Sequence, residues 1–269
     1  MFDTGALATA EAVVAAVKAG KTLSGCDFYQ LNFDGLNLQK AILAKATLVR
    51  CSLRATQLHG ADLSGADLRA ADLRQALLSG ANLMGACLYR ADLRGADLRA
   101  ADLTDAQVRG ACYDSQTIFP DGFAYQGSGA IGPGAHLNGA ALNTANLRYA
   151  DLQGTNLLGA YLGGADLQGA NLQGARLAQA DLRRASLVGA CLRQARLNGS
   201  NLMGVDLRAA DLTDAAFEGF ESIAGADFTQ AQGLTAAMKT LLLGQPAEQL
   251  DTMHPLTRTT TRASLRSLL

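Results

Sequence analysis

Residues 61–75 read ADLSGADLRAADLRQ, three consecutive units in which leucine returns at every fifth position with alanine two places before it. The same cadence runs from residue 26 to residue 217 in two blocks of seventeen units each. The first block carries its bulky apolar residues from Phe28 to Val108, and the second carries them from Leu137 to Phe217. Internal repetition at a fixed period is typical of solenoid proteins, whose units bury their apolar sides by stacking.

A period of five fits neither an α-helix nor an ordinary β-strand. On a helix, residues five apart step by about 140° per unit, so the leucines would spread around the whole surface. The pattern fits a chain that turns a corner in every unit and sends one small and one large side chain inward. Glycine stands two places after many of the leucines, as at Gly65 and Gly95, which suits a corner that needs unusual backbone angles.

Segments 61–65 (ADLSG), 91–95 (ADLRG) and 170–174 (ANLQG) resemble the A(D/N)LXX consensus of the pentapeptide-repeat family. Residues 117–123 (TIFPDGF) resemble a segment that interrupts some bacterial, particularly cyanobacterial, members of that family. The resemblance covers most of the chain. It implies an all-β solenoid, a right-handed quadrilateral β-helix with four units per coil and short α-helical caps at both ends. Residues twenty apart would then stack in columns along the coil axis, one layer of ~4.8 Å per coil.

The cadence and its interruptions predict six segments. They are an N-terminal capping helix (1–20), repeat block 1 (21–113), an inter-block loop (114–134), repeat block 2 (135–232), a C-terminal capping helix (233–244) and a basic Ser/Thr-rich tail (245–269). Caps are expected because the open ends of a β-helix would otherwise associate edge to edge. The helical stretches are 9–19, with Thr9 as N-cap, and 235–243.

The chemistry-bearing residues form no pattern typical of a catalytic, cofactor or metal site. Five cysteines and three histidines are scattered without metal-ligand spacing. A GxGxxG pattern at 127–132 is followed by Pro133 instead of a helix, so a dinucleotide site is not expected. We therefore expect a non-enzymatic protein without cofactor, metal or transmembrane segment. Cysteines without a preceding secretory signal favour a cytoplasmic location.

Protection of DNA gyrase by DNA mimicry is an alternative function that the resemblance suggests. A duplex mimic needs long acidic columns, because DNA carries about one phosphate charge per 1.7 Å of its axis. The net charge of this chain is −1, and Asn82 separates Asp62 from Asp102 in their column. The leading interpretation is a scaffold for protein–protein interaction, including a regulatory one. Its protein partner is unidentified, and nucleic acid is not the expected partner.

Two arginines in the second block depart from the repeat in a way that favours partner binding. Arg176 and Arg196 replace the usual Asp or Asn, and they should stack on each other with no acid in their column. They are candidates for contact with an acidic partner. By contrast, a first-block column of Arg54, Arg74 and Arg94 should be compensated by neighbouring aspartates.

The loop at 114–134 carries two further candidates, Phe119 and Phe123. The favoured interpretation is that both rings fold back onto the coils around a turn at 120–122. The alternative is that the loop contacts a partner, since loops on rigid scaffolds often carry recognition.

The last candidates are Arg258, Arg262 and Arg266, spaced by four in the tail. A helical tail would place them on one face and form a basic amphipathic element for a partner or for weak contact with an anionic membrane surface. A disordered, solvated tail is the favoured alternative, because its many Ser and Thr residues weaken helix formation.

Overall fold

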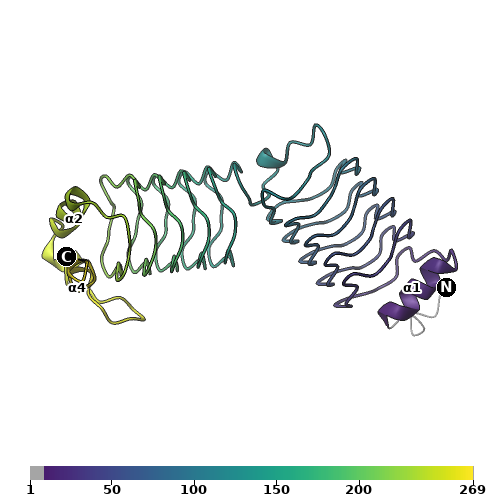
Figure 1. Ribbon diagram of the computed structural model, residues 1–269, viewed down its shortest axis with the longest axis horizontal. Helices are drawn as coiled ribbons and strands as arrows, with labels where there is room; N and C mark the ends of the chain where they lie inside the picture. The colour runs from purple at the N-terminus through teal and green to yellow at the C-terminus, as the bar shows by residue number, and fades with distance from the viewer. Residues whose placement is uncertain (1–8, 269) are drawn as a thin grey trace. The chain divides into compact units, whose positions relative to one another are not determined.

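The computed structural model describes residues 9–268 and divides into two compact units, Met1–Ile131 and Gly132–Leu269. Each unit is a stack of coils that follow one another in chain order, as the colour gradient of Figure 1 shows. Residues 1–8, part of the predicted N-terminal cap, and residue 269 lie outside the described part. Within residues 9–268, no helix has the length and apolar character needed to cross a membrane.

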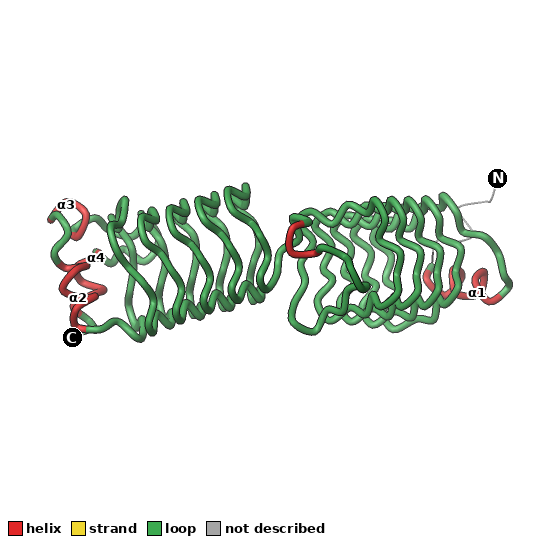
Figure 2. The backbone as a smooth tube through the Cα atoms, turned by 90° about the horizontal axis from the view of Figure 1, so that it is seen from above, coloured by secondary structure: helices red, strands yellow, loops and turns green. Residues whose placement is uncertain are grey.

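Parallel β-bridges join successive coils, and in the regular parts they pair residues twenty apart. Asp62 pairs with Asn82 and Asn82 with Asp102, and in the second unit Asp166 pairs with Ser186. A register of twenty means four five-residue units per coil, as predicted. Each side of a coil offers one bridge residue before the next corner, so the repeats of residues 9–268 contain isolated bridges instead of longer strands (Figure 2).

The corners explain why the repeat tolerates glycine so often. Leu63 donates its N–H to the carbonyl of Asn82 in the next coil at 2.8 Å, and Ala66 donates to the carbonyl of Leu63 at 2.9 Å. The second bond closes a four-residue turn in which Gly65 has φ +62°. A positive φ favours glycine because it has no Cβ. The predicted corner is therefore confirmed, although Lys45 adopts φ 58° at the equivalent position.

The leucines and alanines of the cadence fill the interior of the coils. Leu78 and Leu167 are completely buried, as are the alanines at Ala76 and Ala165. Burying one leucine side chain contributes about 1.5–3 kcal/mol, so stacking the layers is the main source of stability. The inward phenylalanines are buried near the ends of the array, as predicted, at Phe28, Phe33, Phe217 and Phe228.

The segment predicted as an inter-block loop forms one irregular coil of the first unit. Ile118 pairs with Asp97 across twenty-one positions, and Ile131 pairs with Cys112 across nineteen. The short 3-10 helix η2 (Tyr125–Gly127) lies between these two bridges. Coil pairing therefore continues to Ile131, beyond the predicted block end at residue 113.

Two helices lie where the sequence predicts them. Helix α1 (Ala10–Lys18) and helix α2 (Ala236–Leu243) begin after the N-caps Thr9 and Thr235, whose side chains accept a backbone N–H three residues on at 3.3 Å and 3.2 Å. Val13 of α1 is completely buried. The role of both helices as caps against edge-to-edge association stays a prediction.

The C-terminal segment is folded, so the favoured prediction of a disordered tail is wrong. It contains helix α3 (Ala247–Leu250) and helix α4 (Thr261–Arg266), with an antiparallel bridge between Met253 and Thr260. Leu265 is completely buried. The hydroxyl groups that were expected to oppose order instead form caps and tertiary hydrogen bonds.

Three side-chain hydrogen bonds attach this segment to the last coils. Thr257 Oγ1 donates to Asp227 Oδ2 at 2.6 Å, Thr261 Oγ1 donates to the carbonyl of Ile223 at 3.1 Å, and the N–H of Ile223 donates to Gln249 Oε1 at 2.9 Å. Burial alone would raise the pKa of Asp227, which is completely buried. Hydrogen bonds from Thr229 and Thr257 outweigh burial and hold this pKa below its ordinary value.

Two adjacent leucines allow a direct test of the filled interior. Leu78→Ala should lower the free energy of unfolding by about 2–5 kcal/mol, because the side chain is lost from a closed core and a cavity remains. Leu77→Ala, the same chemical change on the partly exposed outer side, should cost markedly less. Urea unfolding followed by circular dichroism measures both, and equal losses would contradict the assignment of inner and outer sides.

Asp227→Ala should release the C-terminal segment, because a charged hydrogen bond to Thr257 worth roughly 1.5–3 kcal/mol is lost. Trypsin should then cleave at Arg258 roughly ten-fold faster or more. The control is Asp211→Ala: Asp211 accepts from Thr213 as Asp227 does from Thr229, but it makes no hydrogen bond to residues 245–268. Equal cleavage of the two variants would show that Asp227 does not hold the segment.

Candidate interaction surface

The residue before each leucine organises the outer surface. Where it is Asp or Asn, its Oδ1 commonly accepts the backbone N–H two positions on, at 3.0 Å from Ser64 to Asp62 and at 3.2 Å from Gln173 to Asn171. This Asx turn satisfies a backbone donor near the corner. Aspartate or asparagine at this position therefore has a structural function in the repeat.

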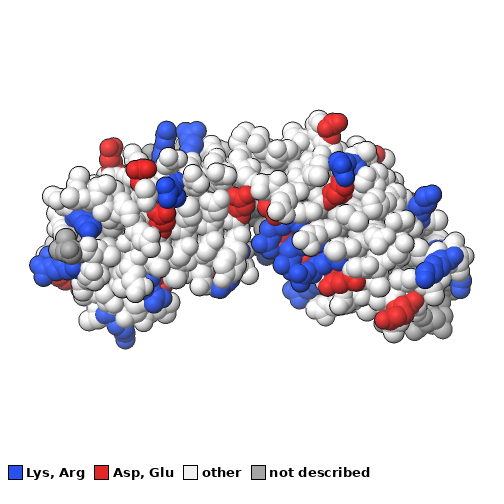
Figure 3. Space-filling model, in the orientation of Figure 1, with Lys and Arg blue, Asp and Glu red and all other residues white. Residues whose placement is uncertain are grey.

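Several arginines neutralise the aspartate two positions before them. Arg99 Nη2 lies 2.6 Å from Asp97 Oδ2, and Arg183 Nη2 lies 2.7 Å from Asp181 Oδ2. Hydrogen bonds from these guanidinium groups lower the pKa of both carboxyl groups. In Figure 3, Lys and Arg are interspersed with Asp and Glu over much of the visible face, and one group of Lys and Arg stands together on the N-terminal unit.

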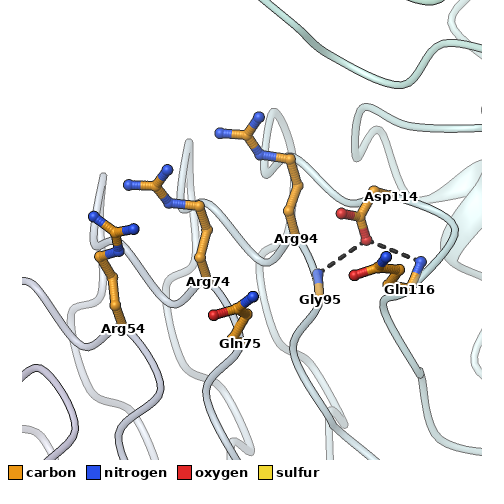
Figure 4. Close-up of a pocket in the computed structure, with 7 residues that line it drawn as sticks. All are labelled: Arg54, Arg74, Gln75, Arg94, Gly95, Asp114 and Gln116. Atoms are coloured by element: carbon orange, nitrogen blue, oxygen red, sulfur yellow. Dashed lines mark hydrogen bonds between the residues drawn. The ribbon is translucent and has the colours of Figure 1, made fainter.

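An open pocket of about 220 Å³ follows the predicted arginine column of the first unit (Figure 4). Its guanidinium groups extend to the same side in the close-up, and they come from successive coils. The lining residues are Arg54, Arg74, Gln75, Arg94, Gly95, Asp114 and Gln116.

Carboxylates compensate this column, as predicted. Arg94 Nη2 lies 2.5 Å from Asp92 Oδ2, and Arg74 Nε lies 3.6 Å from the same oxygen while its Nη2 pairs with Asp72. At the end of the column, Asp114 Oδ1 accepts the N–H of Gly95 at 2.9 Å. The pocket is therefore a self-compensated surface with little free charge to offer an anion.

Arg176 and Arg196 lack such compensation. They form a β-bridge with each other, both are exposed, and within residues 9–268 neither forms an ion pair. Their column continues into neutral residues, Asn156 on one side and Ala216 on the other. Like charges on adjacent rungs repel unless an anion lies between them.

Two acids on the neighbouring sides are already engaged. Asp181 pairs with Arg183, and Asp211 accepts the hydroxyl of Thr213 at 2.6 Å and lies 3.4 Å from Arg193 Nη1. An arginine before leucine also forfeits the Asx hydrogen bond. The pair at Arg176 and Arg196 thus carries two local costs, a like-charge contact and the loss of two Asx acceptors.

The structure places Phe119 and Phe123 in an aromatic cluster of the irregular coil. Phe119 stacks on Tyr125 with ring centroids 4.6 Å apart and meets Phe123 at 5.6 Å and Tyr113 edge-on at 5.4 Å. Tyr113 itself is buried. The rings thus fold back onto the coils, as the favoured interpretation predicted, and contact of Phe119 and Phe123 with a partner stays a prediction.

The three tail arginines do not share one helical face, which corrects the alternative interpretation of the tail as a basic amphipathic helix. Arg262 and Arg266 belong to α4, whereas Arg258 precedes it with φ 63°. Arg262 Nε lies 2.7 Å from Asp251 Oδ1. The structure therefore places Arg258 outside the helix that carries the other two arginines.

Sequence analysis missed one group of side chains in the first unit. Tyr29 and Tyr89 are 47% and 40% exposed, and each lies beside an arginine that pairs with no carboxylate within residues 9–268, Arg50 and Arg90. These tyrosines and arginines become visible in the sequence when the two residues after each inward apolar residue are compared at a spacing of twenty.

Among residues 9–268 the structure contains neither a metal-binding group of side chains nor a disulfide. Within residues 9–268, no three His, Cys, Asp or Glu side chains are grouped as a metal site requires. All five cysteines are free thiols. Burial raises the pKa of Cys51 and Cys112 to about 11, so these thiols are unreactive at neutral pH.

A protein with five-residue units, columns of residues twenty apart and an interior filled by side chains is a β-helical repeat protein. The family model described as pentapeptide repeats matches in eight copies, which include residues 22–60, 32–69, 61–99, 76–112, 134–164 and 160–199. These matches together span more than half of the chain. The protein belongs to the pentapeptide-repeat family, whose fold is a right-handed β-helix.

Solved structures of the same family are similar to this chain. HetL from the cyanobacterium Nostoc sp. strain PCC 7120, involved in heterocyst differentiation regulation, is 25% identical over 84% of this chain and 98% of its own, with a TM-score of 0.28. The pentapeptide repeat protein alr5209, also from Nostoc, is 34% identical over 45% of this chain and 93% of its own, with a TM-score of 0.28.

Full-length QnrB1, a plasmid-mediated fluoroquinolone resistance protein, is 21% identical over 81% of this chain and 97% of its own, with a TM-score of 0.23. No curated protein matches the chain. With TM-scores this low, the neighbours carry no functional argument, and the family assignment rests on the repeats.

Replacing the two unpaired arginines by asparagine should stabilise the protein. Arg176→Asn with Arg196→Asn removes the like-charge contact and restores two Asx acceptors, which should raise the free energy of unfolding by about 1 kcal/mol or more. The reverse control is Asn171→Arg, which removes the 3.2 Å bond to Gln173 and should destabilise. Urea midpoints measure both, and an unchanged or lower midpoint for the double variant would contradict the proposed cost.

Proposed function

We propose that this protein is a non-enzymatic β-helical scaffold that binds an acidic protein partner through Arg176 and Arg196. The observation that carries the proposal is the stacked, exposed pair of guanidinium groups with no carboxylate in its column. A carboxylate of a partner between the two side chains would turn repulsion into two charge-assisted hydrogen bonds. The local costs of the pair are then offset on binding.

The surroundings of the pair favour a protein partner. Leu158, 38% exposed, and Ala178 occupy the second outward position of the same side, and Gly159 of the first coil donates its N–H to the carbonyl of Ala178 in the next at 2.9 Å. Ala178 therefore lies on the rung of Arg176, Leu158 lies on the rung before it, and Asn198 occupies the equivalent position beside Arg196. An arginine pair next to a modest apolar area is the composition that protein interfaces favour.

The filled interior is consistent with a scaffold, because function must then lie on outward side chains. The free cysteines support a reducing compartment, and we propose a cytoplasmic location on that ground. Gyrase protection remains the alternative, although the net charge of −1 and the interrupted acidic columns argue against mimicry of a duplex.

Affinity capture from the native host tests the proposal. The wild-type protein should retain a partner that R176Q/R196Q loses by roughly ten-fold or more, because two charge-assisted contacts are removed. The control R99Q/R148Q removes the same charge from arginines that pair with Asp97 and Asp166, and it should retain the partner. Loss of the partner by both double variants would indicate a general charge effect and reject the assigned site.

A further inference from the structure

A second surface follows one edge of the first unit. We define the Tyr–Arg edge as Tyr29, Arg50, Tyr89, Arg90 and Arg109. Each of these residues occupies the first or second position after an inward apolar residue, on either side of the same corner.

Backbone hydrogen bonds place the Tyr–Arg edge on consecutive coils. The N–H of Gln30 donates to Val49 at 3.0 Å, and the N–H of Arg50 donates to Arg69 at 3.0 Å. The series continues from Ala70 to Tyr89 at 3.0 Å and from Arg90 to Arg109 at 3.3 Å. With layers ~4.8 Å apart, Arg50 and Arg90 lie about 10 Å from each other along the edge.

Contacts between tyrosines and arginines already position the side chains of the edge in the absence of a partner. Arg50 Nη1 lies 3.5 Å from the hydroxyl of Tyr29, and the guanidinium carbon of Arg90 lies 5.2 Å from the ring centroid of Tyr89. Gly110, in the next coil, packs against the second pair: a Cβ there would lie 3.5 Å from Arg90 Cγ and 3.9 Å from the Tyr89 ring. Groups fixed in this way lose little side-chain entropy on binding.

The edge carries positive charge that its own acids do not cancel. Arg69, between the two Tyr–Arg pairs, is bound to Asp67 at 2.6 Å. Arg50, Arg90 and Arg109 are exposed and form no ion pair with any residue from 9 to 268. Three unpaired guanidinium groups beside two exposed tyrosines set this edge apart from the compensated column at Arg54, Arg74 and Arg94.

We propose that the Tyr–Arg edge is a docking site for an acidic segment of a partner protein. Tyrosine and arginine, together with tryptophan, are enriched among residues that dominate binding energy at protein interfaces. Carboxylates spaced about 10 Å apart would meet Arg50 and Arg90, and apolar side chains of the same segment would pack on the tyrosine rings. This surface is independent of Arg176 and Arg196 and does not rest on their function.

A single-stranded nucleic acid fits the edge less well. Stacking of bases needs open aromatic faces along the strand. One face of Tyr89 is occupied by Arg90, and the two tyrosines are three coils apart, about 14 Å. An acidic peptide needs neither an open face nor a regular stacking series.

Fluorescence anisotropy with two probes tests the proposal. The protein carries R176Q/R196Q, so that the arginine pair of the second unit does not contribute to binding. The probes are a labelled peptide of repeating Glu-Glu-Leu and a labelled single-stranded oligothymidylate of about equal length. R50Q/R90Q should weaken peptide binding about ten-fold, and Tyr29→Ala with Tyr89→Ala should weaken it by a similar factor. The control R69Q/R99Q, whose arginines are already paired with carboxylates, should change it by at most about two-fold.

Thermal unfolding of each variant establishes that the coils remain folded. The proposal is overturned if the peptide shows no saturable binding at millimolar concentration, or if R69Q/R99Q weakens it as much as R50Q/R90Q does. Tighter binding of the oligothymidylate through Arg50 and Arg90 would assign the edge to nucleic acid and likewise overturn the proposal.

Discussion

The hydrogen bond between one coil and the next is the constraint on which the rest of the structure depends. In the regular coils the N–H of the inward leucine reaches the carbonyl nineteen positions on, as from Leu63 to Asn82, and this fixes four units per coil. The register leaves room inside for one small and one large side chain per unit. It also leaves every outward side chain directly above a partner in the next layer, so surface chemistry is decided column by column.

The side chains around each arginine decide whether its charge is neutralised within the chain or is available to a partner. Where an aspartate stands two positions before an arginine, as at Asp97 and Arg99, the charge is neutralised within the unit. Arg176 and Arg196 occupy the aspartate position itself, so each removes an acceptor and adds a charge. On the Tyr–Arg edge, aromatic rings replace carboxylates as the neighbours of Arg50 and Arg90, which leaves those charges available.

Much of the fold could be predicted from the sequence, because a solenoid repeats one local solution. The cadence placed Leu78 inside and Gly65 at a corner, and it paired Asp62 with Asn82. The C-terminal segment could not be predicted in this way. Its order depends on Thr257 meeting Asp227 and on Gln249 meeting Ile223, contacts between a non-repetitive stretch and particular coils. No periodicity encodes such pairs.

Because of the four-unit register, the place of a side chain on the surface follows directly from its position in the sequence. Moving a pair of side chains by five positions carries it to the next side of the same layer, and moving it by twenty translates it by one layer along the axis. The backbone is unchanged by either move, provided that the corner and the inward residues are kept. The chemistry of Arg176 and Arg196 could thus be transplanted onto positions such as Asp166 and Ser186, which are paired in the same way. Position and chemical identity are separable variables on this scaffold, so each can be varied while the other is held constant.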